Sequence, residues 1–185
     1  MILTLPVLFL LLKLPMAWGE LSKEEYSVYA VLLKTWASRN YVVQAETRDA
    51  VLTRDFHGAI QFLRRELQKQ KPLVTLPDDL AVSYKQVYGQ SVPLEPSRLG
   101  VPAARMVSRA DVEHFMQTWD DFEKGYPGAT TIITMSRVGF NKDETKALVS
   151  MSQYCGGLCG EAAYVILEKV GRKWVARARV IALYW

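Results

Sequence analysis

Hydrophobic and polar residues alternate through the last third of the chain, and this alternation predicts antiparallel strands. Residues 130–136 alternate branched and polar side chains, and residues 146–154 follow after a turn-forming segment at 141–144. A period of two residues is typical of a strand with one buried face. We expect strands near residues 130–138, 146–154, 162–169 and 174–184, joined as a single antiparallel meander.

The two faces of the last predicted strand differ in character. One face carries Trp174, Ala176 and Ala178, and the other carries Arg177 and Arg179. Small alanine side chains let a helix approach a sheet closely, so we expect helices on the Trp174 face. The predicted fold class is therefore α+β, with N-terminal helices packed on a C-terminal four- to five-stranded antiparallel meander sheet.

Apolar residues in the N-terminal half recur at three and four residues, the spacing of one helix face. Ser22 and Glu25 match a capping box, and the apolar positions after them predict a helix ending near residue 38. The pattern predicts further helices over residues 56–71, from 78 to about 89, and from 108, with short strands near 41–45 and 104–107. Trp119, Phe122 and Tyr126 also recur at helical spacing, and we expect them to anchor the last helix in the core.

An apolar run at residues 2–12 precedes Lys13 and the small residues Ala17 and Gly19. At about 1.5 Å per residue, this run is too short to cross a hydrocarbon core of roughly 30 Å, but it fits the core of a signal peptide. We therefore expect a signal peptide at residues 1–19, a single α+β domain at 20–185, a secreted or periplasmic location, and no transmembrane span after cleavage. The nearby cation follows the apolar run instead of preceding it, so an uncleaved anchor or a different start are the alternatives.

The charge of the chain changes this picture little. The 185 residues include 23 Lys and Arg against 19 Asp and Glu, a formal net charge of +4. This excess is too small to indicate nucleic-acid binding, so no nucleic-acid partner is expected. Basic residues concentrate in residues 165–185, which form either a solvated strand face with its hairpin tip or a contact for an acidic partner. The composition leaves the ligand or protein partner unknown.

Both cysteines, Cys155 and Cys159, stand at a predicted turn with Gly156 and Gly157 between them. Glycine frees the backbone for a three-residue hairpin loop, which would bring the cysteines within the roughly 4.4–6.8 Å Cα spacing of disulfides. In an exported chain this arrangement predicts a structural disulfide. A metal site lacks two further ligands, and a redox role lacks the usual Cys-x-x-Cys spacing, so we expect no metal and no cofactor.

Arg137 and Asn141 are the polar residues of most interest for binding. In a structural interpretation, Arg137 pairs with a carboxylate such as Asp120, and Asn141 caps a turn through its side chain. In a functional interpretation, the same corner binds an anionic or carbohydrate-like group, floored by Tyr154 or Trp119. Arg137, Asn141, Tyr154 and Trp119 are therefore the candidate binding residues.

The sequence contains no serine nucleophile elbow, no phosphate-binding loop and no Glu-x-x-His metal motif. A cysteine with His57 or His114 as base is formally possible, but both histidines lie in predicted helices. We therefore expect a non-enzymatic exported binding or interaction module, with an exported hydrolase or thiol-dependent enzyme as the alternative. A pocket holding two titratable groups within hydrogen-bond reach would favour the enzyme, and an aromatic patch without such a pair would favour binding.

Four short segments carry a resemblance to other proteins. They are Ser-Arg-Val-Gly-Phe-Asn at 136–141, Cys-Gly-Gly-Leu-Cys-Gly at 155–160, Leu-Glu-Lys at 167–169 and Lys-Trp-Val at 173–175. In this combination the chain resembles a group of uncharacterised bacterial secreted proteins. Residues 119–122, 126–128 and, more weakly, the predicted helix at 25–33 extend the resemblance over most of residues 20–185. It departs at 161–163, where Glu-Ala-Ala replaces the expected glycine or aromatic residues. It implies export and carries no activity with it.

Overall fold

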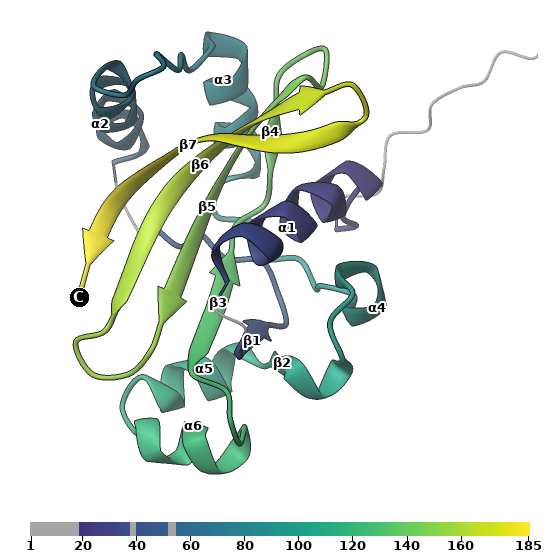
Figure 1. The fold of residues 1–185 in the computed structure, drawn as a ribbon, viewed down its shortest axis with the longest axis vertical. Helices are drawn as coiled ribbons and strands as arrows, with labels where there is room; N and C mark the ends of the chain where they lie inside the picture. Colours follow the sequence, from purple (N-terminus) through teal and green to yellow (C-terminus); the bar gives the residue numbers. More distant parts are fainter. Residues whose placement is uncertain (1–18, 38–39, 52–54) are drawn as a thin grey trace, which may run out of the picture.

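The computed structural model describes residues 19–37, 40–51 and 55–185, with helices in the N-terminal two thirds of the chain and the longest strands at its end (Figure 1). The signal peptide predicted for residues 1–19 lies outside the described residues except at Gly19. The helices are α1 (Lys23–Trp36), α2 (Phe56–Gln68), α3 (Asp78–Val87), α4 (Pro96–Leu99), the 3-10 helix η1 (Ala103–Arg105), α5 (Arg109–Phe115) and α6 (Trp119–Gly125). Within the described residues, no helix has the length and hydropathy needed to span a membrane.

All strands of the described residues belong to one mixed sheet. The strands are β1 (Tyr41–Gln44), β2 (Met106–Val107), β3 (Thr131–Met135), β4 (Gly139–Phe140), β5 (Lys146–Tyr154), β6 (Gly160–Val170) and β7 (Lys173–Tyr184). Six of them follow the order β2-β1-β3-β5-β6-β7, and β4 pairs with β5 beyond the end of β3. β1 runs parallel to both β2 and β3, and the other pairs are antiparallel.

The predicted antiparallel meander is confirmed for β3, β5, β6 and β7, but the prediction of a four- to five-stranded antiparallel sheet is wrong. The sheet has seven strands and is mixed. β1, β2 and β4 contain only four, two and two residues, and strands this short do not show a recognisable two-residue alternation. Parallel neighbours also require a long crossover. Helices α2 to α6 separate β1 from β3 in the chain, and no local pattern indicates that the two strands pair.

The first helix begins where the sequence predicts it. The hydroxyl of Ser22 accepts a hydrogen bond from the backbone N–H of Glu25 at 3.0 Å, and the Glu25 carboxylate accepts one from the backbone N–H of Ser22 at 2.9 Å. This capping box satisfies two backbone donors at the start of α1. It also fixes the Glu25 carboxylate at the buried side of the helix, where it meets the β3–β4 connection.

The strand expected over residues 130–138 ends at Met135 because the backbone leaves the ladder to bury an ion pair. Arg137 donates to the two carboxylate oxygens of Glu25 at 3.0 and 3.1 Å, and to the side-chain oxygen of Gln90 at 3.0 Å. The side chains of Arg137 and Glu25 are only 14% and 3% exposed. A carboxylate buried to this extent needs a charged partner, so the pair fixes the β3–β4 connection against α1.

The pairing of β6 with β7 shifts register at two places, and one of these shifts falls between Ile166 and Leu167 of β6. A bulge adds one residue to one strand, so the alternation of faces along β7 changes phase there. Trp174 and Ala176 pack in the cluster under α1, whereas Ala178 is buried in the cluster under α2 and α3. The expectation that helices cover the face of Trp174 and Ala176 is confirmed, but the expectation that Ala178 lies on that same face is wrong.

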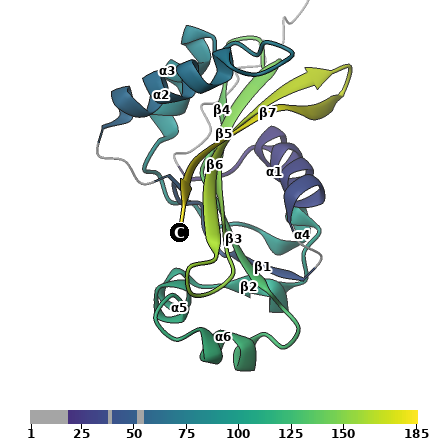
Figure 2. The same cartoon turned by 60° about the vertical axis from the view of Figure 1, so that its left-hand side comes forward.

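Helices cover both faces of the sheet (Figure 2). α1 and α4 lie on one face, while α2 and α3 cover one end of the opposite face and α5 and α6 cover its other end. Tyr29 is buried in the first cluster, Tyr84 and Tyr164 in the second, and Phe122 and Tyr154 in the third. The second and third clusters share one face of the sheet, and the candidate site lies between them.

The last helix expected before the meander is divided into two short helices. α5 ends at Phe115, and α6 begins at Trp119. Thr118 has φ −136° and ψ 74°, outside the helical region, so the chain turns here, and its hydroxyl donates back to the carbonyl of His114. This turn lets Phe115 and Phe122 meet edge to face, with ring centroids 5.6 Å apart.

Candidate functional site

A pocket of about 460 Å³ opens on the sheet face that α2, α3 and α5 share. Side chains of β1, β3 and β5 form its floor, residues 48–51 form one wall, and Val112 and Met116 form the opposite wall. Its far end is formed by Ala182, Leu183 and Trp185. Figure 2 shows the C-terminus lying between the α2–α3 pair and α5. The volume falls in the range of roughly 300–1,000 Å³ that ligand pockets occupy.

Three polar side chains form a row across the pocket floor. Thr134 pairs with Ser152 across β3 and β5, and the Thr134 hydroxyl donates to the side-chain oxygen of Gln44 at 3.1 Å. Gln44 is 1% exposed, and its Nε2 has no hydrogen-bond partner within the described part of the chain. An unpaired buried donor costs about 1–3 kcal/mol. The floor therefore holds an amide that a ligand oxygen would stabilise.

The wall formed by residues 48–51 is fixed to the sheet through its backbone. The N–H of Arg48 donates to the carbonyl of Met135 at 2.8 Å, and the N–H of Ala50 donates to the hydroxyl of Ser150 at 3.1 Å. Ser150 is fully buried, so this second bond is shielded from water. Two anchors on either side of Asp49 hold this wall in one position.

Asp49 lines the pocket, but its carboxylate is bound to the end of α3. One oxygen accepts from the backbone N–H of Gly89, and the other accepts from the Tyr84 hydroxyl at 3.4 Å. Burial raises the pKa of Asp49 from 3.8 to about 6, and the two hydrogen bonds oppose this rise. Both oxygens are thus used within the protein, and the group serves as an anchor for α3.

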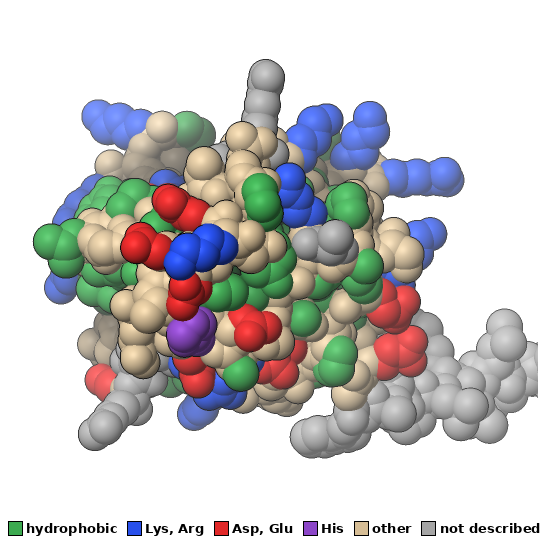
Figure 3. All heavy atoms as spheres, turned by 90° about the horizontal axis from the view of Figure 1, so that it is seen from below, with side chains coloured by type: hydrophobic (Ala, Val, Ile, Leu, Met, Phe, Trp, Pro, Cys, Tyr) green, Lys and Arg blue, Asp and Glu red, His purple; other side chains and the backbone are tan. Residues whose placement is uncertain are grey.

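Arg48 reaches from its wall to α5 at the mouth of the pocket. Its guanidinium lies 3.3 Å from the carboxylate of Glu113, and Arg109 lies 3.0 Å from the same oxygen. The hydrogen bond from Arg109 lowers the pKa of Glu113. Figure 3, which shows the α5–α6 end, has acidic side chains with basic ones among them on this surface. Pairs this exposed contribute little to stability, so Arg48 is free to exchange its partner.

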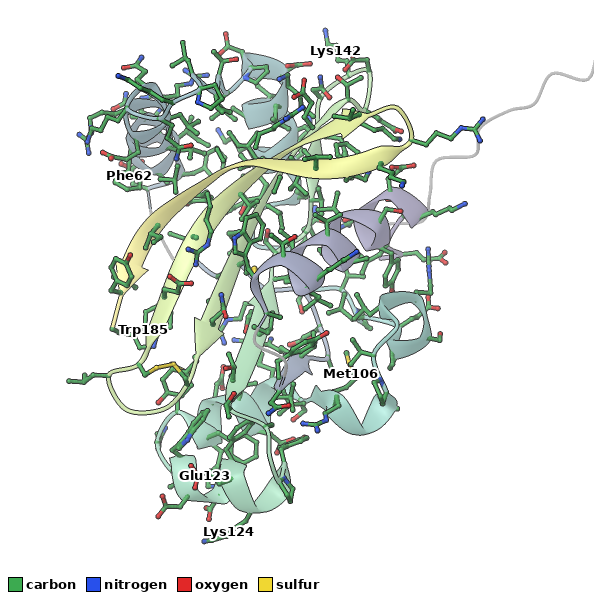
Figure 4. The ribbon with its side chains drawn as sticks, viewed as in Figure 1. Phe62, Met106, Glu123, Lys124, Lys142 and Trp185 are labelled. Carbon is green, nitrogen blue, oxygen red and sulfur yellow. A yellow bond between two sulfur atoms is a disulfide. The ribbon has the colours of Figure 1, made fainter. Side chains whose placement is uncertain are left out.

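The end of the pocket formed by the last residues of β7 and by Trp185 is apolar apart from the indole N–H of Trp185. Leu183 is 53% exposed at the mouth, and Ala182 and Trp185 are half-buried. The backbone N–H of Trp185 donates to the carbonyl of Gly160 at 3.2 Å, and the indole packs on this glycine, where a Cβ would not fit. Figure 4 shows the labelled Trp185 at the end of β7, beside the β5–β6 turn and its disulfide.

The disulfide predicted between Cys155 and Cys159 is confirmed, with Cα atoms 5.1 Å apart. Gly156 and Gly157 have φ angles of 88° and 56°, in the left-handed region that glycine adopts without strain. The Trp119 ring packs directly over Gly156, where no Cβ would fit. The disulfide loop therefore closes the β5–β6 hairpin and provides the surface on which α6 packs.

Tyr154 and Trp119, two of the four predicted binding residues, lie together at this end of the sheet. Their rings meet edge to face at 5.2 Å, and the Tyr154 hydroxyl donates to the carbonyl of Met116 at 3.3 Å. Tyr154 lines the pocket, whereas Trp119 stacks on Phe122 at 4.3 Å between ring centroids and supports Tyr154 from outside the pocket.

Arg137 lies at the opposite end of β3 from these aromatic residues. Tyr154 pairs with Ile132 near the start of β3, and Arg137 follows the end of the strand. Its carboxylate partner is Glu25, where the sequence suggests one such as Asp120. The structural interpretation is thus correct in that Arg137 pairs with a carboxylate, but this carboxylate belongs to Glu25.

Asn141 holds the turn between β4 and β5. Its side-chain oxygen accepts from the backbone N–H groups of Thr145 at 3.0 Å and Lys146 at 2.7 Å. The four predicted residues therefore do not share one site: Tyr154 and Trp119 meet at the pocket, and Arg137 and Asn141 lie at the far end of the sheet. A binding role for the latter pair stays a prediction.

The polar floor of the pocket is not identified by motif searching. Its signal is a polar residue at an inward-facing strand position, since most buried polar groups need a partner. Gln44 follows two buried valines in β1, and Thr134 interrupts the apolar residues of β3. Ser152 lies on the same face of β5. These three residues can be recognised as one polar row only when the pairing of the strands is known.

The described residues contain no group of three or more His, Cys, Asp or Glu side chains able to hold a metal ion. Comparisons of the chain with known protein families, with curated proteins and with solved structures find no match. The function is therefore argued from the pocket and its chemistry.

Proposed function

We propose that this protein is an exported, non-enzymatic module that binds a small molecule in the pocket between the α2–α3 pair and α5. The observation that carries the proposal is a pocket of about 460 Å³ on a sheet floor, in which the buried Nε2 of Gln44 has no hydrogen-bond partner among the described residues. A concave, mostly apolar site with a few placed polar groups is the usual form of a ligand pocket. The apolar run at residues 2–12 and the disulfide support export, since disulfides persist in oxidising compartments.

The enzyme alternative has weaker support from the same pocket. Among the described residues, its titratable lining groups are Arg48, Asp49 and Tyr154. Arg48 bonds to Glu113, the oxygens of Asp49 accept from α3, and Tyr154 donates to a backbone carbonyl, so these groups do not form an acid–base pair. The two cysteines are bonded to each other, which leaves the thiol-dependent enzyme without a nucleophile among the described residues.

An NMR screen against a library of small organic fragments tests the proposal. We expect several fragments to shift the amide signals of the pocket floor and of residues 48–51 in the wild-type protein. Ser152→Phe fills the centre of the floor and should abolish these shifts. Ser91→Phe places the same ring at an exposed position away from the pocket lining and should leave them unchanged.

A rim variant guards against misfolding of the floor variant. Leu183 is 53% exposed, so Leu183→Glu leaves the core intact and places a charge at the apolar mouth. We expect it to weaken the binding of apolar fragments. The proposal is wrong if no fragment shifts the pocket signals, or if fragments bind Ser152→Phe and Leu183→Glu as they bind the wild type.

A further inference from the structure

The pocket is polar at one end and apolar at the other. The polar row of Gln44, Thr134 and Ser152 crosses β1, β3 and β5. The register continues this row through β6 to Leu183 on β7, where the lining becomes aliphatic. A ligand that fits both ends must itself be amphipathic, with its polar group over β1 and β3 and its apolar part toward β7.

The polar end of the pocket offers hydrogen-bond donors. The Gln44 amide is 1% exposed, and its Nε2 lacks a partner within the described chain. Arg48, whose side chain is 29% exposed, lines the same pocket from the wall formed by residues 48–51. A group carrying acceptor oxygens satisfies both, and a planar guanidinium pairs with a carboxylate through two parallel hydrogen bonds.

Arg48 can turn toward a ligand without leaving a carboxylate unpaired. Its present partner, Glu113, is also bound by Arg109, at 3.0 Å against 3.3 Å for Arg48. When Arg48 moves, Glu113 keeps this closer cation. The protein therefore holds an arginine at the mouth whose surface ion pair is replaceable.

We propose that the pocket binds a small amphipathic carboxylic acid. The carboxylate meets Arg48 and the Gln44 amide, and the hydrocarbon part lies toward Met116 and Leu183, which are 51% and 53% exposed at the rim. This inference rests on the proposed function, since it names the ligand class of the same pocket. The hydrocarbon part of the ligand then covers these exposed apolar side chains and removes their surface from water.

Asp49 is the one acidic group in the pocket lining, and its position is compatible with an anionic ligand. Its oxygens accept from Gly89 and Tyr84 on the side of α3. Burial also keeps a fraction of this carboxyl protonated near pH 6, because its pKa is raised to about 6. A ligand carboxylate at Arg48 therefore faces the backbone side of this wall and the unpaired Nε2 of Gln44, while the Asp49 oxygens are held toward α3.

Calorimetry with octanoate, 1-octanol and octylamine tests the head group on one hydrocarbon chain. We expect wild-type protein to bind octanoate at least about tenfold more tightly than octanol, a difference of about 1.4 kcal/mol, and octylamine most weakly. Arg48→Met should reduce octanoate affinity about tenfold and leave octanol affinity unchanged. Arg109→Met is the matched control, because it removes the same charge from Glu113 at a position outside the pocket lining, and it should leave octanoate binding intact.

The outcomes separate this inference from the proposed function. Equal affinity for octanoate and octanol, with both blocked by Ser152→Phe, would overturn the carboxylate preference and leave a general binding pocket. Equal losses in Arg48→Met and Arg109→Met would assign the effect to surface charge and would also overturn it. Failure of all three compounds to bind, beside fragments that do shift the pocket signals, would exclude this ligand class alone.

Discussion

The Asp49 carboxyl should make the folded protein less stable as the pH rises. Burial raises its pKa from 3.8 to about 6, so the folded state holds a proton between these values that the unfolded chain has released. The free energy of unfolding therefore falls with rising pH across this window. The contribution of Asp49 is fully present below pH 3.8 and is lost above about pH 6. Asp49→Asn removes this titration and keeps an oxygen that can accept from the Gly89 N–H.

The size of the effect follows from the pKa difference. The gap between 3.8 and about 6, at roughly 1.36 kcal/mol per pKa unit, corresponds to about 3 kcal/mol. Asp49 is 7% exposed but lines the pocket, so water in the pocket screens part of the effect and about 3 kcal/mol is its upper value. The carboxylate accepts two hydrogen bonds and asparagine accepts fewer, which reduces the gain by about 1 kcal/mol. We expect Asp49→Asn to be about 1–3 kcal/mol more stable than wild type above the folded-state pKa and nearly equal to it at low pH.

Urea unfolding followed by tryptophan fluorescence, on both proteins at several values between pH 4 and pH 7.5, measures this difference. Asp120→Asn removes the same charge from the exposed first turn of α6 and controls for the change in net charge. A stability difference that does not grow between pH 4 and pH 7.5 would refute the reasoning. So would an Asp49→Asn protein that is less stable than the wild type at the upper end.

Three further substitutions test the packing. Trp119→Ala should lower the free energy of unfolding in urea by about 2–4 kcal/mol, and a loss below about 1 kcal/mol would show that this ring is not part of the core. Replacing both Cys155 and Cys159 by serine should give a folded protein about 2 kcal/mol less stable, because the disulfide closes a short loop; non-reducing mass spectrometry should find both thiols oxidised in the wild type. Arg137→Met should lower stability by about 3–5 kcal/mol because Glu25 is left buried without its cation, and a loss under about 1 kcal/mol would contradict this.

The elements that the sequence predicts well are those with long, regular periodicity. The capping box at Ser22 fixes the start of α1, and strands β5, β6 and β7 span nine to twelve residues each. Such lengths contain enough repeats for a period to be read. The same reasoning explains why β1, β2 and β4 add a mixed edge that the antiparallel prediction lacks: their pairing is set by contacts distant in sequence.

The covered faces of the sheet depend on a feature without a clear sequence signal. In the sequence, the residues of β7 alternate regularly between two faces. In the structure, the pairing of β7 with β6 shifts register between Ile166 and Leu167. After that shift Ala178 meets the helices of the opposite face from Trp174. A bulge depends on how the two strands pair, and this pairing is a property of the folded sheet.

Only part of the candidate site could be predicted from the sequence, because some of its residues are conspicuous there and others are not. The aromatic residues Tyr154 and Trp119 stand out by size; Tyr154 lines the pocket, and Trp119 packs against it from outside. Arg137 stands out by charge, but its charge is used by Glu25 in the core. Gln44 is inconspicuous in the sequence, and it is distinguished by its burial with an Nε2 that has no partner among the described residues.

Gln44→Leu separates stability from binding at the pocket floor. The unpaired Nε2 of Gln44 costs about 1–3 kcal/mol, and leucine fills a similar volume without a donor. The Thr134 hydroxyl loses its acceptor in this variant, but it lines the pocket and can donate to water there. The two effects oppose each other, so we expect a stability equal to wild type or up to about 1 kcal/mol higher.

Measuring both stability and octanoate binding on Gln44→Leu therefore separates a structural role of this side chain from a role in binding. In calorimetry we expect Gln44→Leu to bind octanoate about tenfold more weakly than wild type, because the buried amide no longer donates to the carboxylate. Urea unfolding of the same sample supplies the stability. A variant that loses more than about 1 kcal/mol of stability and keeps its octanoate affinity would show that Gln44 supports the sheet and takes no part in binding.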